Sequence, residues 1–245
     1  MDSGFYAACT GLLAKTDALE VAANNLANVS TNGYKAQTEF YRALTASLND
    51  RRLSPLNEAV NDYGVLGGAT VDLKKGEFQR TGNELDLALQ GEGFFAVKTP
   101  AGIRYTRNGS FHTDINGRLM TSTGDVVMGD QGPIDLPGGA IAISSDGIIS
   151  QQGAPVAQFK LVTFKPGIAL APEGNSLYQA PKGSELPADD PQVSQGMLES
   201  SNMNAVSGAV NLVTLQRHAQ LLQQALAIFH STFNGTAAQD LSRVT

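Results

Sequence analysis

Cysteine is almost absent from this chain of 245 residues, since Cys9 is the only one, and no disulfide can form within it. Charged residues are also scarce, at 16% against a usual share of about 25%. The formal net charge of -6 disfavours non-specific nucleic-acid binding, which uses Lys and Arg to replace phosphate counterions. No apolar run reaches the roughly 18 residues of a membrane-spanning helix. With 42% hydrophobic residues, the chain is nevertheless predicted to fold rather than to form a disordered tail.

The N-terminus also lacks the basic region and the uninterrupted apolar stretch of a cleavable signal peptide. Taken alone, this absence predicts a cytoplasmic protein.

Two helices are predicted, one at each end of the chain. In residues 3–28 an apolar residue recurs at every seventh position, namely Phe5, Leu12, Leu19 and Leu26, with Cys9, Thr16 and Ala23 between them. This helix is expected to stop at residues 30–33, where Asn32 and Gly33 offer a left-handed cap. The second seam comprises Leu212, Leu215, Ala219, Leu222, Leu226, Phe229 and Phe233, is widened by Leu221, Ala225 and Ile228, and is expected to close at Asn234-Gly235.

The C-terminal helix has almost no charge. Between Met203 and Gln239 the only charged side chain is Arg217. An exposed surface helix normally carries Glu and Lys on its outer face, so this one suits burial on several sides. Neighbouring copies of the chain could provide that burial.

The middle of the chain predicts antiparallel β-structure. The dipeptides Asn108-Gly109, Asn116-Gly117 and Asp146-Gly147 each separate two β-forming runs, which is a strong hairpin signal, and residues 157–164 alternate as a further strand. We therefore predict an α+β fold in which the terminal helices pair as a coiled-coil-like domain beside a central antiparallel β sandwich or barrel-like domain. The expected ranges are 1–35 and 200–245 for the helical domain, 36–68 for an extended connector and 69–199 for the β domain.

Side chains with catalytic or metal-binding chemistry are poorly placed. Ser110, His112 and Asp114 point the same way from one strand, about 6.5–7 Å apart, whereas a catalytic triad needs convergent contact. His112 and Asp114 also lack a clustered third metal ligand.

Glu84, Asp86 and Glu92 are candidates for paired-carboxylate glycoside chemistry, although Asp86 is expected on a solvated strand face. Gly91-Glu92-Gly93 precedes a strand and not a helix, unlike a dinucleotide loop, so Gly93 is expected to mark a bulge or tight strand entry. We predict no catalytic residue, no metal and no cofactor.

Three asparagines near the end of the first helix are more informative. Asn24, Asn25 and Asn28 weaken a helix, and Asn25 and Asn28 flank Leu26 on the seam. They could cap a fraying helix end, or their amides could fix the register between packed helices. Cys9 lies on the same seam and is expected to be a small buried thiol rather than a nucleophile.

Several segments resemble the bacterial flagellar rod and hook protein family, in the family's order. They are residues 23–35 (ANNLANVSTNGYK), 82–97 (GNELDLALQGEGFFAV), 105–111 (YTRNGSF), 114–119 (DINGRL) and 196–204 (GMLESSNMN). Within the second segment, the resemblance assigns Asp86, Gly91, Gly93, Phe94 and Phe95 to the signature of the β domain. The length suits a rod subunit, and the opening Met-Asp with Tyr6 favours the proximal-rod type over the distal-rod type. The residues after Arg217 depart from the family pattern, because His218, Ala219 and Gln220 stand where a small residue, an aromatic and an acid are usual.

The resemblance implies a structural subunit of the basal-body rod, without catalysis, which assembles helically into a tube across the periplasm. Its partners would be other rod subunits and hook-side axial proteins, with no nucleic acid and no membrane insertion. Export would use the flagellar type III apparatus, which cleaves no signal peptide. The two helix seams, together with Asn24, Asn25 and Asn28, are the expected interface. The rivals are a carbohydrate-active enzyme dependent on Glu84 or Asp86, and a cell-surface coiled-coil adhesin stalk.

Overall fold

The structure is a computed structural model that describes residues 2–42, 65–165 and 167–243. The chain forms two compact units. Unit 1 combines Met1–Ala27, Gln37–Ala69 and Ala205–Thr245, and unit 2 combines Asn28–Ala36 with Thr70–Asn204. Each unit is therefore assembled from segments that are far apart in the sequence.

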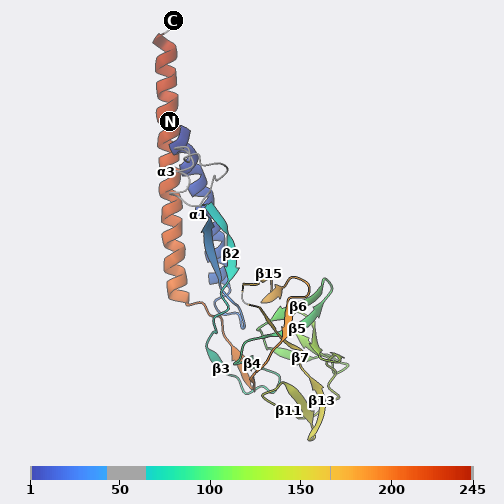
Figure 1. Cartoon of the computed structure of the whole chain (residues 1–245). Coiled ribbons are helices and arrows are strands. Elements are labelled where there is room, and N and C mark those ends of the chain that lie inside the picture. Colours follow the sequence, from blue (N-terminus) through green and yellow to red (C-terminus); the bar gives the residue numbers. More distant parts are fainter. Residues whose placement is uncertain (1, 43–64, 166, 244–245) are drawn as a thin grey trace. The chain divides into compact units, whose positions relative to one another are not determined.

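Unit 1 contains both helices of the described chain. Helix α1 (Asp2–Ala27) lies beside helix α3 (Ala205–Arg243), as Figure 1 shows. The same unit holds a two-stranded sheet of β1 (Gln37–Arg42) and β2 (Val65–Val71), and β1 contacts α1. The segment expected as an extended connector therefore supplies strands to the helical unit.

The packing between α1 and α3 uses small side chains on α1. Ala18 and Ala22 are buried against Leu215, with Leu19 and Leu212 packed around them. The buried row along α1 comprises Ala8, Gly11, Ala14, Ala18, Ala22 and Asn25. This row lies one residue before the predicted seam, whose Leu12, Leu19 and Leu26 are only half-buried. Small residues allow the closest approach between helices, so the alanine row, and not the leucine row, lies deepest.

The predicted helix ends also differ from the observed ones. Helix α1 ends at Ala27, and Gly33, with φ of 64°, lies too far along the chain to cap it. Helix α3 continues through Asn234-Gly235 to Arg243. The Asn-Gly pair therefore lies within α3 and does not end it.

Unit 2 is built from short strands. They are β3 (Phe78–Arg80), β4 (Leu87–Leu89), β5 (Phe94–Thr99), β6 (Gly102–Thr106), β7 (Phe111–Thr113), β8 (Leu119–Thr121), β9 (Val126–Gly129), β10 (Gly132–Pro133), β11 (Ile141–Ile143), β12 (Ile148–Gln151), β13 (Ala154–Gln158), β14 (Leu161–Phe164), β15 (Ala171–Gly174), β16 (Leu177–Gln179), β17 (Glu185–Pro187), β18 (Val193–Gln195) and β19 (Met197–Glu199).

The largest sheet of unit 2 has ten strands. Its main path runs β15-β16-β6-β5-β9-β8-β7, while β10 pairs with β9, and β14 pairs with both β5 and β17. Strands β11, β12 and β13 form a three-stranded sheet, and the pairs β18-β4 and β19-β3 form two small sheets. All of these strand pairs are antiparallel.

Strand β5 is buried on both faces, because its alternating side chains enter two different cores. Phe95 and Val97 belong to a large cluster that includes Phe111, whose ring centroid lies 5.1 Å from that of Phe95. Phe94 and Ala96 belong to a second cluster with Tyr105, Val162, Leu170 and Tyr178. This continuous run of buried positions makes β5 the central strand of unit 2.

The predicted fold class is therefore wrong as stated. The described residues contain two helices and a large β-rich unit, whose strands form one branched ten-stranded sheet and several small sheets. The heptad seam of leucines that suggested a coiled coil is not the buried row of α1. Periodicity alone could not show this, because the alanine row has the same spacing.

The turn predictions had mixed outcomes. Asn116-Gly117 joins β7 to β8, and Asp146-Gly147 joins β11 to β12, both as predicted. Asn108-Gly109 does not form a hairpin, since β6 pairs with β5 and β16 while β7 pairs with β8. Residues 157–164 are not one strand, because they are divided between β13 and β14.

Candidate functional site: a buried ionic anchor and an exposed helix face

A cluster of three charged side chains lies buried in unit 2, and we call Lys35, Arg107 and Glu199 the anchor. The ammonium Nζ of Lys35 lies 2.6 Å from Glu199 Oε1, and Nη1 of Arg107 lies 3.4 Å from Glu199 Oε2. The side chain of Glu199 is 0% exposed and that of Lys35 is 1% exposed. The three residues come from three different segments among those that resemble the rod and hook family.

Backbone groups bind most of the remaining polar atoms of the anchor, while the buried Nε of Arg107 has no hydrogen-bond partner among the described residues. Lys35 Nζ also donates to the carbonyl oxygen of Lys74 at 2.6 Å, and the amide of Gly76 donates to Glu199 Oε1 at 2.9 Å. Arg107 donates to the carbonyl oxygens of Leu89 and Gly91, both at 2.9 Å, and its guanidinium lies 5.3 Å from the ring centroid of Phe94. A buried charge is tolerated only when it is paired and hydrogen-bonded in this way.

The anchor places two positive charges against one negative charge away from water. Burial lowers the pKa of Lys35, and the hydrogen bond and charge of Glu199 oppose that shift. Burial also lowers the pKa of Arg107, again against the attraction of Glu199. Glu199 is thus the carboxylate that pairs directly with both cations, while Asp72 and Glu92 add weaker attraction to Lys35 and Arg107 respectively.

The chain around Lys35 is tied down by further hydrogen bonds. The amide of Gly33 donates to the carbonyl oxygen of Glu199 at 2.7 Å, and that of Lys35 donates to the Tyr178 hydroxyl at 2.9 Å. The amide of Ala36 donates to Asn202 Oδ1 at 2.8 Å. Residues 28–36 are therefore held by side chains and backbone from the other end of unit 2.

Gly33 lies where no larger residue fits. A Cβ built on it would lie 2.2 Å from the backbone nitrogen of Asn108 and 2.3 Å from the carbonyl carbon of Arg107. Its φ of 64° is also one that side chains rarely adopt. Gly33 thus serves close approach to the Arg107 segment, and not helix capping.

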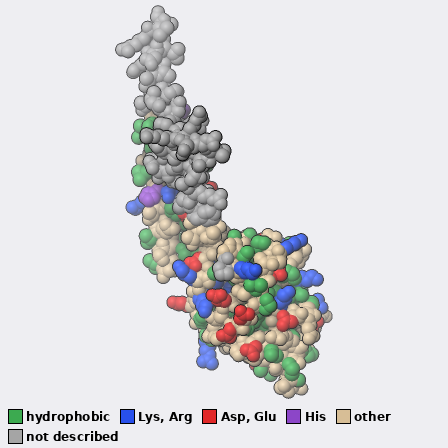
Figure 2. All heavy atoms as spheres, in the orientation of Figure 1, with side chains coloured by type: hydrophobic (Ala, Val, Ile, Leu, Met, Phe, Trp, Pro, Cys, Tyr) green, Lys and Arg blue, Asp and Glu red, His purple; other side chains and the backbone are tan. Residues whose placement is uncertain are grey.

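A second feature is the outward face of α3, which points away from the residues that pack on α1. Its apolar members are spaced four, three or more residues apart and are largely exposed: Val206 (75%), Val210 (62%), Val213 (48%), Leu221 (61%) and Ile228 (65%). Arg217 falls in the same row. We call these six residues the outward stripe. In Figure 2, hydrophobic atoms are visible along the described part of α3, whereas charged side chains gather on unit 2.

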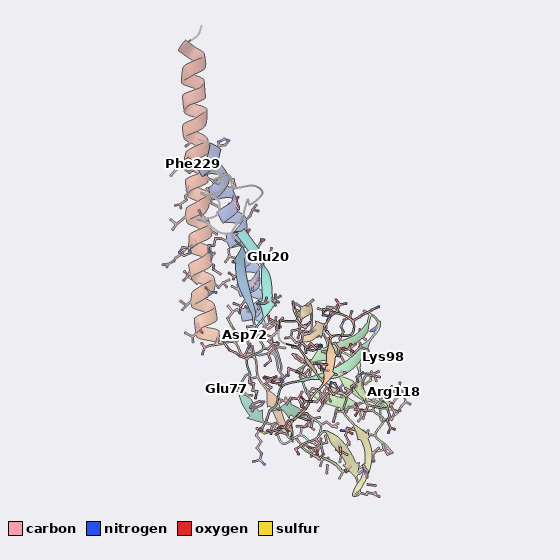
Figure 3. All side chains as sticks on the ribbon, in the orientation of Figure 1. Glu20, Asp72, Glu77, Lys98, Arg118 and Phe229 are labelled. Atoms are coloured by element: carbon pink, nitrogen blue, oxygen red, sulfur yellow. The ribbon has the colours of Figure 1, made fainter. Side chains whose placement is uncertain are left out.

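The predicted seam residues are found in unit 1 with differing burial. Leu215 is buried, Leu12, Leu19, Leu26, Leu212, Leu222 and Leu226 are half-buried, and Phe229 is 49% exposed. Figure 3 labels Phe229 on α3 and Glu20 on α1. The side chains of Phe5 and Phe233 lie outside the described residues. A role of these residues between subunits stays a prediction.

Asn25 has a specific structural role at the end of α1. Its side-chain Nδ2 donates to the carbonyl oxygen of Gln37, and its Oδ1 accepts from the amide of Gln37, both at 2.8 Å. The amide thereby pairs with the first residue of β1. Asn24 is exposed and Asn28 is half-buried in the turn after the helix, where its Oδ1 accepts from the hydroxyl of Thr31.

The residues of the expected β-domain signature belong to the interior of unit 2. Phe94 and Phe95 enter opposite cores, and Gly93 is buried with φ of 141° at the entry to β5. The carbonyl oxygen of Gly91 accepts from Arg107. Asp86 is buried and accepts from Asn83 Nδ2, so the solvated face expected for it was wrong.

The other candidates for chemistry lie apart from the anchor. His112 is exposed on β7, opposite in direction to the buried Phe111. Asp114 belongs to the next turn, where backbone amides of Arg118 and Asn116 donate to it and lower its pKa. Glu84 and Glu92 are exposed, and Cys9 is half-buried on α1. Among the described residues, no group of three or more His, Cys, Asp or Glu side chains could hold a metal ion. In the same part of the chain, neither helix contains a stretch that is both long enough and apolar enough to cross a membrane.

Comparison with known proteins matches two family models to this chain. A family model described as "Flagella basal body rod protein" matches residues 5–35, and one described as "Flagellar hook protein FlgE/F/G D1 domain" matches residues 88–151. The flagellar basal-body rod protein FlgF of Caulobacter vibrioides is 35% identical over 224 residues, covering 89% of each chain. FlgF of Escherichia coli is 34% identical, covering 93% of this chain and 94% of its own. FlgG of Buchnera aphidicola is 31% identical, covering 89% of this chain and 92% of its own.

The chain belongs to the flagellar basal-body rod protein family. It is accordingly a structural rod subunit of the flagellar basal body, as the sequence resemblance predicted. Relatives named FlgF, the expected proximal-rod type, and FlgG, the distal-rod type, both match across most of the rod protein.

The anchor was missed by reasoning from the sequence, although its residues lie inside the quoted segments. Lys35 and Glu199 are 164 positions apart and were treated as parts of separate motifs. One signal could have indicated them. In each of three family-like segments, a charged residue lies within two positions of a glycine or a serine, namely Lys35 after Gly33, Arg107 before Gly109 and Glu199 before Ser200.

Proposed function

We propose that this rod protein is a non-catalytic building block that joins neighbouring axial subunits through the outward stripe of α3. One observation carries the proposal. The stripe leaves five Val, Leu and Ile side chains largely exposed on a helix whose opposite face already packs on α1. Fully burying one such side chain stabilises an interface by about 1.5–3 kcal/mol, so a partner surface would gain substantially from covering the stripe.

The composition of the helix supports the same proposal. Arg217 is the only charged side chain between Met203 and Gln239, so contact with a partner would desolvate few charges. Helix α1 differs, because Asp17 and Glu20 are exposed on its surface. The outward stripe is therefore the more favourable of the two helix surfaces for a partner.

The test compares two substitutions that add the same charge to the same helix. Leu221→Glu places a carboxylate in the outward stripe, whereas Gln223→Glu places one on another exposed face of α3. Each variant would be produced in a flagellated strain that lacks its own copy, and incorporation would be measured in purified basal bodies. We expect Leu221→Glu to abolish incorporation and swimming while Gln223→Glu leaves both intact. Equal incorporation of the two variants would refute the proposal.

We also propose a place in the proximal rod, with export by the flagellar type III apparatus and no cleavage of a signal peptide. The Met-Asp opening with Tyr6 supports the proximal type, as do two FlgF relatives of 35% and 34% identity, while other FlgF and FlgG relatives overlap at 31–32%. The gene should restore swimming to a strain lacking FlgF and not to one lacking FlgG. The protein in basal bodies should keep its full mass, and the opposite results would contradict these assignments.

A further inference from the structure

Residues 28–36 belong structurally to the β-rich unit even though they follow α1 directly. This segment contains no helix or strand of its own. It is held by hydrogen bonds from Gly33, Lys35 and Ala36 and by the ion pair of Lys35 with Glu199. All of the partners lie within unit 2.

The other side of the anchor is also fixed within unit 2. Glu199 ends strand β19, whose three residues pair with β3, and the amide of Ser200 donates to the carbonyl oxygen of Glu77 at 2.8 Å. Asn202 follows, and its Nδ2 donates to the carbonyl oxygen of Asp72 at 2.8 Å. Neither set of contacts uses a residue of α1 or α3.

We infer that the anchor is a clamp that keeps residues 28–36 folded on unit 2 whether or not the two helices are ordered. Residues 28–36 would then stay folded in a free subunit together with the described residues of Thr70–Asn204, and ordering during assembly would concern unit 1. This inference is independent of the proposed interface on α3.

The charges of the anchor predict an asymmetry between its members. Removing the carboxylate of Glu199 leaves two buried cations without the counter-charge that both of them contact, which is strongly destabilising. Removing the ammonium of Lys35 leaves Arg107 and Glu199 as a neutral pair. Glu199→Gln should therefore release residues 28–36 much more than Lys35→Met does.

Limited digestion of the full-length protein with trypsin, followed by mass spectrometry, tests the clamp. Cleavage needs local unfolding, so the rate at Lys35 reports the opening of the segment. Leu215→Asp disturbs the helix pair, since Leu215 is buried against Ala18 and Ala22. We expect this variant to be cut rapidly at Lys15 and Arg217 and to stay uncut at Lys35.

The converse variant is Glu199→Gln. We expect cleavage at Lys35 to accelerate on the order of a hundredfold or more, while the rate at Lys15 changes little. Glu77→Gln makes the same charge change on an exposed side chain, labelled in Figure 3, and should leave the rate of cleavage at Lys35 unchanged.

Lys35→Met removes the cleavage site, so hydrogen exchange at the Ala36 amide is measured in place of digestion. We expect this exchange to accelerate less than tenfold.

Two results would overturn the inference. One is cleavage of Leu215→Asp at Lys35 as fast as at Lys15, because the segment would then depend on the helices. The other is an unchanged rate at Lys35 in Glu199→Gln, because the ionic group would then not hold the segment. If Glu199→Gln fails to fold, the digestion of Leu215→Asp alone decides.

Discussion

A close backbone approach at the anchor provides a sharp stability prediction, because Gly33 lies against the segment that carries Arg107. In Gly33→Ala, the new Cβ would lie 2.2 Å from the backbone nitrogen of Asn108, where no flexible side chain can yield. The φ of 64° costs a further 1–2 kcal/mol for alanine, roughly. Overpacking typically adds about 1–3 kcal/mol. We therefore expect Gly33→Ala to lower the free energy of unfolding of unit 2 by about 2–5 kcal/mol.

A matched control separates backbone strain from the clash. Gly183 has φ of 78°, and a Cβ added to it would meet no atom within 4 Å, so Gly183→Ala should lose only the strain of about 1–2 kcal/mol. Urea unfolding followed by tyrosine fluorescence is a suitable assay, because Tyr34, Tyr105 and Tyr178 are buried in unit 2. Equal destabilisation by the two substitutions would refute the close approach of Gly33 to the Arg107 segment.

Two further predictions concern individual polar side chains. Asn25→Ala should accelerate hydrogen exchange at the Gln37 amide, which loses its 2.8 Å acceptor, whereas Asn24→Ala on the exposed side of α1 should not; equal rates would contradict the pairing. The backbone amide of Arg118 is the main cause that lowers the pKa of Asp114 below its usual 3.8. The Asp114 carboxylate therefore stabilises the fold fully at pH values above 3.8. This stabilisation is lost as the pH falls through the lowered pKa. Asp114→Asn should therefore be less stable than the parent protein near neutral pH, and the difference measured by urea unfolding should shrink below about pH 4; a difference independent of pH would contradict this.

The terminal helices were predictable because their apolar periodicity is long and regular, whereas their contacts were not. On α1 two rows share the same spacing, and the more hydrophobic leucine row suggested the seam. The structure buries the row of Ala18 and Ala22 instead, since small side chains bring α3 closer. Choosing between two such rows requires the partner surface, which one sequence does not contain.

The β-rich unit shows a similar limit. The turns at Asn116-Gly117 and Asp146-Gly147 follow from local conformational preference, and they formed as predicted. At Gly109 the same dipeptide signal misled, because the glycine is needed where a Cβ would lie 1.8 Å from the carbonyl oxygen of Leu87. A close contact between distant segments and a hairpin turn both select glycine, so the residue type cannot distinguish them.

The anchor was hidden for a different reason. Charged residues are expected on the surface, and Lys35, Arg107 and Glu199 are distant in sequence, so nothing local indicated that they meet. Their burial becomes understandable only once β19, the segment after α1 and the chain after β6 are brought together.

Site-specific crosslinking in purified basal bodies tests most directly whether this rod protein assembles through the outward stripe. With Cys9 replaced by alanine, a single cysteine would be placed at Leu221 in the stripe or at Gln223, about 200° further around the helix. We expect a short bifunctional thiol-to-amine reagent to join the cysteine at position 221 to a neighbouring axial subunit and to leave the one at position 223 largely unlinked. Equal crosslinking at both positions, or none at position 221, would contradict it.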